Sequence, residues 1–151
     1  MPIFIDRALV LNPNRAAGWL LSGLVNCWLG RPEVGIERAT HAVRLSPLDP
    51  LTSLAFTMIG AGHFFVGRYD EASSWAEKAL REQPNWAAAA RVAAASHALA
   101  GRLDQAQKAA VRLRQIDPTF RVSDFRRMFP FRRPEDIARF EEGLRKAGLP
   151  E

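Results

Sequence analysis

The sequence has little of what most small proteins use to build metal and disulfide sites. Among its 151 residues there is one cysteine, and there are three histidines and one tyrosine. The single Cys27 excludes an intramolecular disulfide and also the cysteine pairs of structural zinc sites and thiol-exchange enzymes. We therefore expect a protein of a reducing compartment that has neither a metal site nor a cofactor.

Long apolar runs are also missing. A membrane helix needs about 20 consecutive apolar residues, and Arg, Glu, Asp, Asn or Pro interrupts every long apolar run in this chain. Residues 1–7 lack both a basic segment and a following apolar core with a small-residue cleavage site, so they do not resemble a signal peptide. The expected location is the cytoplasm, without a membrane partner.

The patterns that carry catalysis are absent as well. No serine lies in a nucleophile elbow, and Gly60 and Gly62 lie within a helical pattern rather than in a phosphate-binding loop. The acid pair Glu141 and Glu142 is expected on the polar face of a helix, where solvent explains it. We expect that the protein is not an enzyme, and we assign no catalytic, cofactor-binding or metal-binding residue.

The sequence does contain an internal repeat of 34 residues. Residues 67–72, Gly-Arg-Tyr-Asp-Glu-Ala, return as Gly-Arg-Leu-Asp-Gln-Ala at residues 101–106. Residues 8–13 return at residues 42–47 with the same shift. A period of this length is typical of a solenoid made of stacked helix pairs, each of which cannot bury its apolar face alone.

The repeat resembles the tetratricopeptide repeat (TPR) family, whose motif is W-x2-L-G-x2-Y, then A-x3-F, then P. The matching residues hold the large, small and proline positions of the motif in three successive registers: Trp19, Gly23, Ala42 and Pro47; Phe56, Ile59, Gly60, Ala72, Ala79 and Pro84; Ala90, Ala93, Ala94, Ala106 and Pro118. The first register departs from the motif at Ser22, Asn26, Gly35 and Ala39, and His63 and His97 take the tyrosine position.

The resemblance implies an all-α fold, an α-α superhelix of about three repeats with a C-terminal capping helix. Its boundaries are a half repeat at 1–15, repeats at 16–49, 53–86 and 87–120, and a cap segment with a helix at 121–151. Helices are expected at about 3–11, 15–29, 33–45, 51–66, 70–82, 86–100 and 104–115. Pro32 fits a first helical turn, whereas Asp70 and Asp104 are N-cap candidates. Small residues at Gly23, Gly60 and Ala94 are expected to let paired helices approach closely.

Residues 120–133 combine aromatics and arginines without a helical face, and a last helix begins at Pro134. The formal charge of +5 is concentrated here, since residues 101–151 carry twelve Lys or Arg against eight Asp or Glu. The arginines are Arg121, Arg126, Arg127, Arg132 and Arg133, with Phe125, Phe129 and Phe131 between them. This pattern suits single-stranded nucleic acid, but we favour a cap with locally paired arginines because the last repeat needs a cover.

A second resemblance covers most of residues 42–151. The segments 44–50, 63–72, 129–136 and 143–149 resemble the C-terminal TPR tail of alphaproteobacterial proteins associated with class III adenylate/guanylate cyclases. The resemblance implies a regulatory or scaffolding tail of a bacterial signalling protein. The resemblance does not imply a cyclase domain in this chain, because an all-helical chain of this length leaves no room for a catalytic sheet.

In TPR solenoids the first helix of each repeat lines a concave groove, so the resemblance implies a protein-interaction module that binds a protein or peptide there. The residues in groove positions are Leu20, Leu24, Trp28, Thr57, Ala61, Phe64, Phe65, Arg91 and Ala95. Some of them are equally explained as core. Arg91 is the one charged anchor, suited to a carboxylate.

The N-terminal segment offers an alternative function. Residues 3–11 have the pattern of the second helix of a repeat with no first helix to cover it. The apolar residues Ile5, Leu9 and Leu11 are therefore candidates for self-association, which predicts a homodimer.

Overall fold

The computed structural model describes residues 2–12, 14–48 and 50–151, with side chains described from Asp6 onward. The helices are α1 Pro2–Leu11, α2 Ala16–Trp28, α3 Pro32–Leu45, α4 Thr52–Val66, α5 Tyr69–Glu82, α6 Ala87–Leu99, α7 Leu103–Ile116, the 3-10 helix η1 Val122–Asp124, α8 Phe125–Met128 and α9 Pro134–Lys146. These residues contain no β-strand. The predicted all-α class is confirmed, and the expected repeat helices agree with α1 to α7 to within one residue.

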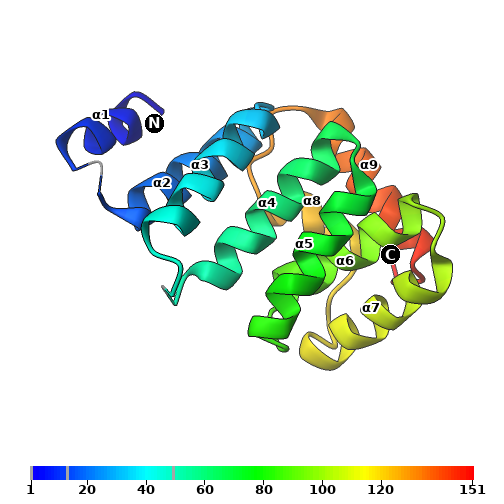
Figure 1. Cartoon of the computed structure of the whole chain (residues 1–151). Helices are drawn as coiled ribbons and strands as arrows, with labels where there is room; N and C mark the ends of the chain where they lie inside the picture. The colour runs from blue at the N-terminus through cyan, green and yellow to red at the C-terminus, as the bar shows by residue number, and fades with distance from the viewer. Residues whose placement is uncertain (1, 13, 49) are drawn as a thin grey trace.

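The helices form antiparallel pairs that stack side by side (Figure 1). The pairs are α2 with α3, α4 with α5, and α6 with α7, and α1 packs on α2 at the outer end of this stack. Helix α4 also contacts both α2 and α6, and these three helices form the inner layer. The arrangement is the predicted α-α superhelix.

Glycines allow the closest helix approaches within the pairs. A Cβ added at Gly23 would lie 3.0 Å from the carbonyl oxygen of Gly35, and one at Gly60 would lie 3.0 Å from that of Ala72. Such distances are shorter than most real Cβ contacts, so the backbones of the paired helices approach closely there. The predicted close approach at Gly23 and Gly60 is confirmed.

The expected helix starts are right for the prolines and wrong for the aspartates. Pro32 lies in the first turn of α3. Asp70 and Asp104 do not cap α5 and α7, because these helices begin one residue earlier, with Arg68 and Arg102 at the N-cap. The aspartates lie instead in the first turn, where the helix dipole favours a carboxylate.

A polar network joins the second and third repeats. The Nε2 atom of His97 lies 3.2 Å from Glu77, and Arg102 donates to Nδ1 of His97 over 3.1 Å. Arg102 also donates to Ser73 over 2.8 Å and pairs with Asp70. His97 is thus a hydrogen-bonded packing residue, as its place in the tyrosine position predicts.

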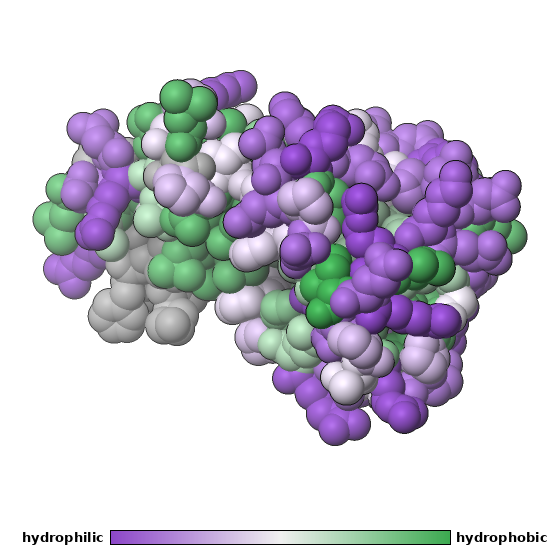
Figure 2. Space-filling view, turned by 90° about the horizontal axis from the view of Figure 1, so that it is seen from below, coloured by the Kyte–Doolittle hydropathy of each residue, from purple (hydrophilic) through white to green (hydrophobic). Residues whose placement is uncertain are grey.

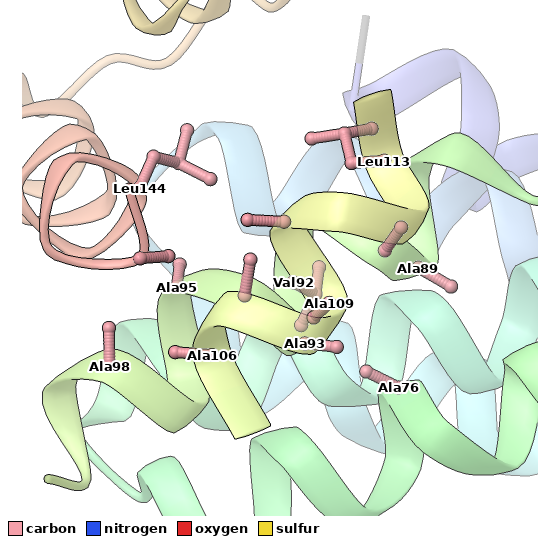
Figure 3. Close-up of a cluster of buried hydrophobic side chains, with 14 of the residues drawn as sticks. Ala76, Ala89, Val92, Ala93, Ala95, Ala98, Ala106, Ala109, Leu113 and Leu144 are labelled. Carbon is pink, nitrogen blue, oxygen red and sulfur yellow. The ribbon is translucent and has the colours of Figure 1, made fainter. Parts of the chain in front are cut away.

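The centre of the third repeat is built from alanine. Figure 3 shows Ala89, Val92, Ala93, Ala95 and Ala98 between the residues of three neighbouring helices. The labelled neighbours are Ala76 of α5, Ala106, Ala109 and Leu113 of α7, and Leu144 of α9. Because methyl side chains occupy little space, the helix axes come close, and packing area comes from backbone as well as from side chains.

Helix α9 closes the stack against α6 (Figure 1). Phe140 and Leu144 are buried, and a Cβ at Gly143 would lie 2.8 Å from the carbonyl oxygen of Ala95. The expectation that Glu141 lies on the polar face of a helix is wrong, because this residue is only 1% exposed. Arg126 donates to its two carboxylate oxygens over 2.8 and 3.0 Å, which compensates the buried charge.

Candidate functional site

The groove positions predicted from the repeat register divide into two groups. Six of them line one pocket on the inner layer: Leu24, Trp28, Thr57, Ala61, Phe65 and Arg91. The other three lie elsewhere. Leu20 belongs to the core between α2, α3 and α4, Phe64 is enclosed by Tyr69 and Phe140, and Ala95 lies beneath α9.

The opposite wall comes from residues 120–133, hereafter the C-terminal segment. After α7 the chain passes behind α4 as α8, continues to the end of α2 and α3, and only then enters α9 (Figure 1). The backbone amide of Arg132 donates to the carbonyl of Trp28 over 2.8 Å. The C-terminal segment therefore returns to the first repeat, rather than covering only the last repeat as expected of a cap.

Aromatic contacts hold the C-terminal segment against the inner layer. The Phe131 ring lies 5.1 Å from that of Phe65, and the Phe129 ring lies 6.3 Å from that of Trp28. Phe125 is stacked on Phe140 of α9 with ring centroids 4.2 Å apart. Offset and edge contacts of this kind stabilise packing beyond the area they bury.

Several pocket residues lie outside the groove positions of the repeat motif. They come from the helices and from the C-terminal segment and α9: Cys27, Leu54, Met58, Ala88, Val92, Phe125, Phe129, Phe131 and Phe140. The sequence pattern of the aromatic residues predicts a cover for the last repeat. Their spacing contains no information about which repeat they contact.

The pocket is small and apolar. Its volume is about 110 Å³, which is less than the 300 to 1,000 Å³ that is typical of cofactor and drug-sized sites. It is also smaller than the roughly 150 Å³ cavity that admits a benzene ring. The space therefore suits one aliphatic side chain or a group of similar size.

Arg91 brings a positive charge into this apolar pocket. The side chain is only 6% exposed, and none of its nitrogen atoms is among the fully buried side-chain atoms of the described residues that lack a hydrogen-bond partner. Its guanidinium carbon lies 5.6 Å from the Phe120 ring and 5.9 Å from the Phe129 ring. Burial lowers the pKa of Arg91, and the negative charge of Asp117 opposes this effect.

The rings compensate this charge only in part, beside the negative charge of Asp117. A cation–π contact contributes about 0.5 to 2 kcal/mol, whereas moving a cation out of water costs several kcal/mol even after relaxation. A guanidinium does not lose its proton at neutral pH. Arg91 therefore keeps its positive charge in the wall of the pocket.

Cys27 contributes to the wall as an apolar group. Burial, followed by the charges of Asp136 and Glu33, raises the pKa of this thiol to about 12. A neutral, buried thiol is a poor nucleophile and a poor metal ligand. Among the described residues no group of three or more His, Cys, Asp or Glu is arranged to hold a metal ion.

The C-terminal arginines are largely engaged within the chain. Arg126 pairs with Glu141, Arg133 pairs with Glu135, and Arg121 donates to the carbonyl of Glu151. Arg127 and Arg132 have exposed side chains. The phenylalanines between them face the pocket, so they are not presented to solvent as a stacking platform for bases.

The N-terminal end carries exposed apolar side chains. Val10 and Leu11 are 81% and 83% exposed, whereas Leu9 is buried against Gly18. Ile5, the third predicted self-association residue, lies outside the residues whose side chains the structure describes. Figure 2 shows apolar residues toward this end of the molecule, interspersed with polar ones. In the described part of the chain, no helix is long and apolar enough to cross a membrane.

Comparison with known proteins shows the fold of this chain. No family model matches the chain, and no curated protein matches it. Among solved structures, a crystal structure of MamA is 19% identical with a TM-score of 0.69, and the match covers 95% of this chain and 82% of MamA.

Two further structures are similar. The first TPR of Spaghetti (RPAP3), bound to the HSP90 peptide SRMEEVD, is 16% identical with a TM-score of 0.67, over 88% of this chain and 90% of that one. YrrB, a TPR protein with an unusual peptide-binding site, is 20% identical with a TM-score of 0.64, over 97% of this chain and 74% of that one. The fold is therefore the TPR superhelix predicted from the 34-residue period.

Proposed function

We propose that this chain is a protein-interaction module that binds an apolar peptide segment of a partner protein on its inner face. The observation that carries the proposal is the pocket formed by α2, α4, α6 and the C-terminal segment, with Arg91 as a buried charge in its wall. Two of the similar structures are described by a bound peptide or a peptide-binding site, which supports this use of the fold. An aliphatic side chain of the peptide fills the pocket, and the rest of the peptide lies along the inner layer.

A peptide library selected against the full-length chain tests this proposal. Ala61→Met fills the pocket without removing a contact. It is expected to lower the affinity of the selected peptides by about ten-fold or more, because one anchor usually dominates such an interface. Val111→Ser on α7 is the matched control, since Val111 is exposed and does not line the pocket. Fluorescence anisotropy measures both affinities. Equal affinity for the two variants, or a library that yields no binder, contradicts the proposal.

A second candidate function is self-association through α1, and the exposure of Val10 and Leu11 favours it. Exposed apolar residues that lie side by side at the end of a solenoid suit a second copy of the same surface. Leu11→Asp is then expected to convert a dimer to a monomer in sedimentation equilibrium. A wild-type chain that is already monomeric at high concentration would dismiss this candidate.

The resemblance to cyclase-associated tails leads to a further proposal, a regulatory tail of a bacterial signalling protein in the cytoplasm. An immunoblot of source cells with an antibody against this chain measures the mass of the native gene product. A band well above the 16.8 kDa of this chain, with cyclase activity in the immunoprecipitate, is expected. An immunoprecipitate without cyclase activity contradicts this proposal and leaves the peptide-binding function unaffected.

A further inference from the structure

We infer that residues 129–132, Phe-Pro-Phe-Arg and hereafter the lid, open to admit the anchor side chain of a peptide to the pocket and then close over it. The inference rests on the proposed function, to which it adds the way in which the partner enters. It starts from the position of these four residues in the pocket wall. Of the described residues that line the pocket, Phe129 and Phe131 are the two that lie outside a helix.

The lid is attached to the repeats by few contacts. In the described part of the chain, its one backbone hydrogen bond to the repeats runs from the amide of Arg132 to the carbonyl of Trp28, over 2.8 Å. The Phe131 ring lies 5.1 Å from the Phe65 ring, and the Phe129 ring lies 6.3 Å from the Trp28 ring. Both lid rings are only partly buried, and the other two lid residues are exposed. A segment with so few buried contacts and hydrogen bonds opens locally at much less cost than the whole fold.

The residues on either side of the lid are held firmly. Before it, Phe125 is buried and stacked on Phe140, with ring centroids 4.2 Å apart. After it, Arg139 fixes the first turns of α9, because it donates to the carbonyl of Phe65 over 3.0 Å and pairs with the buried Asp136. The lid can therefore open while both of its ends stay in place, as in lids that close over bound ligands.

Arg91 lowers the cost of opening the lid. Its guanidinium carbon lies 5.9 Å from the Phe129 ring, and its side chain is 6% exposed. Burial lowers the pKa of Arg91, so the closed lid disfavours its charge. When Phe129 moves away, water reaches the guanidinium, and the regained hydration offsets part of the lost ring contact. A side chain that fills the pocket of about 110 Å³ has the opposite effect, because it adds packing contacts that favour closure.

Amide hydrogen exchange of the free full-length chain, followed by 1H–15N NMR, tests the lid without a peptide. The Arg132 amide is expected to exchange at least about ten-fold faster than the central amides of α6, through an opening that low concentrations of urea do not promote. Pro130→Gly is expected to speed this exchange by about two- to five-fold, because glycine raises the conformational entropy of the open lid. Pro118→Gly, at an exposed proline outside the lid, is the matched control and leaves it unchanged. An Arg132 amide as protected as those of α6, or an equal effect of the two variants, overturns the inference.

Binding kinetics distinguish a lid from a fixed wall. The observed rate of binding of a selected peptide in stopped flow is expected to reach a plateau at high peptide concentration, because opening then limits entry. Phe131→Ala removes the contact with Phe65, so it is expected to raise both the plateau and the dissociation rate by about five-fold or more. Arg127→Ala is the control, since Arg127 is exposed and does not line the pocket. A fixed wall predicts no plateau and a change in the dissociation rate alone.

Failure of this inference and failure of the proposed function are distinguishable. Peptides whose observed binding rate rises linearly with concentration, with the same association rate in Phe131→Ala, leave the proposed function standing and remove the lid. A library that yields no binder removes the proposed function. The exchange experiment then decides on the lid alone, because a protected Arg132 amide contradicts it and a locally exchanging one supports it.

Discussion

Burial acts on two pocket side chains in opposite ways. It keeps the Cys27 thiol neutral by raising its pKa to about 12, so this residue behaves as a small apolar group. Arg91 cannot respond in the same way, because a guanidinium keeps its proton, and its charge stays inside the pocket. The repeat register predicted that Arg91 lies on the inner layer. It could not predict that the residue is buried, since the residues that cover it come from a segment without the repeat.

The chemistry of Cys27 gives a prediction about alkylation. At pH 8 a thiol with a pKa of about 12 has roughly one thiolate in 10,000, whereas an unperturbed thiol near pKa 8.5 is about a quarter ionised. Iodoacetamide is therefore expected to modify the native chain far more slowly than the urea-unfolded chain, with a rate that still rises between pH 8 and pH 10. Mass spectrometry follows the modification. A native rate that reaches a plateau near pH 9 would show an ordinary, accessible thiol.

At the level of elements, the repeat helices were predictable and the C-terminal segment was not. Helices α2 to α7 have a period, apolar faces and small residues at fixed positions, and each of these is visible in the sequence. The short helices η1 and α8 span three and four residues, too few to show a helical pattern. The return of the segment to Trp28 depends on contacts that are distant in sequence, such as Phe65 with Phe131.

The buried acid of α9 predicts an asymmetry between two substitutions. Arg126→Met leaves the Glu141 carboxylate in the interior with Arg145, 3.5 Å away, as its remaining partner. This is expected to lower the free energy of unfolding by about 2 to 4 kcal/mol. Glu141→Gln removes the buried charge and leaves Arg126, which is 60% exposed, in contact with water. This variant is therefore expected to lower the free energy of unfolding by only about 1 to 2 kcal/mol. Urea unfolding compares the two variants, and an equal or reversed order contradicts a buried, arginine-dependent carboxylate.

At the scale of the whole molecule, the 34-residue period determines the superhelix because each helix pair buries its apolar face only against the next pair. The C-terminal segment adds what the period does not contain: a cover that spans the inner layer from the third repeat to the first and leaves a small pocket beneath it. Peptide binding in the groove and self-association through α1 stay predictions. They concern opposite parts of the molecule, the inner layer and the N-terminal end.

The most direct test of the central claim, that partners bind at the inner layer beneath the C-terminal segment, is amide hydrogen exchange of the full-length chain with and without a selected peptide. Slower exchange is expected in α2, α4 and α6 and in residues 120–133, with α3, α5 and α7 little changed. Protection confined to α3, α5 and α7, or to α1, would place the partner on another surface and would contradict the claim.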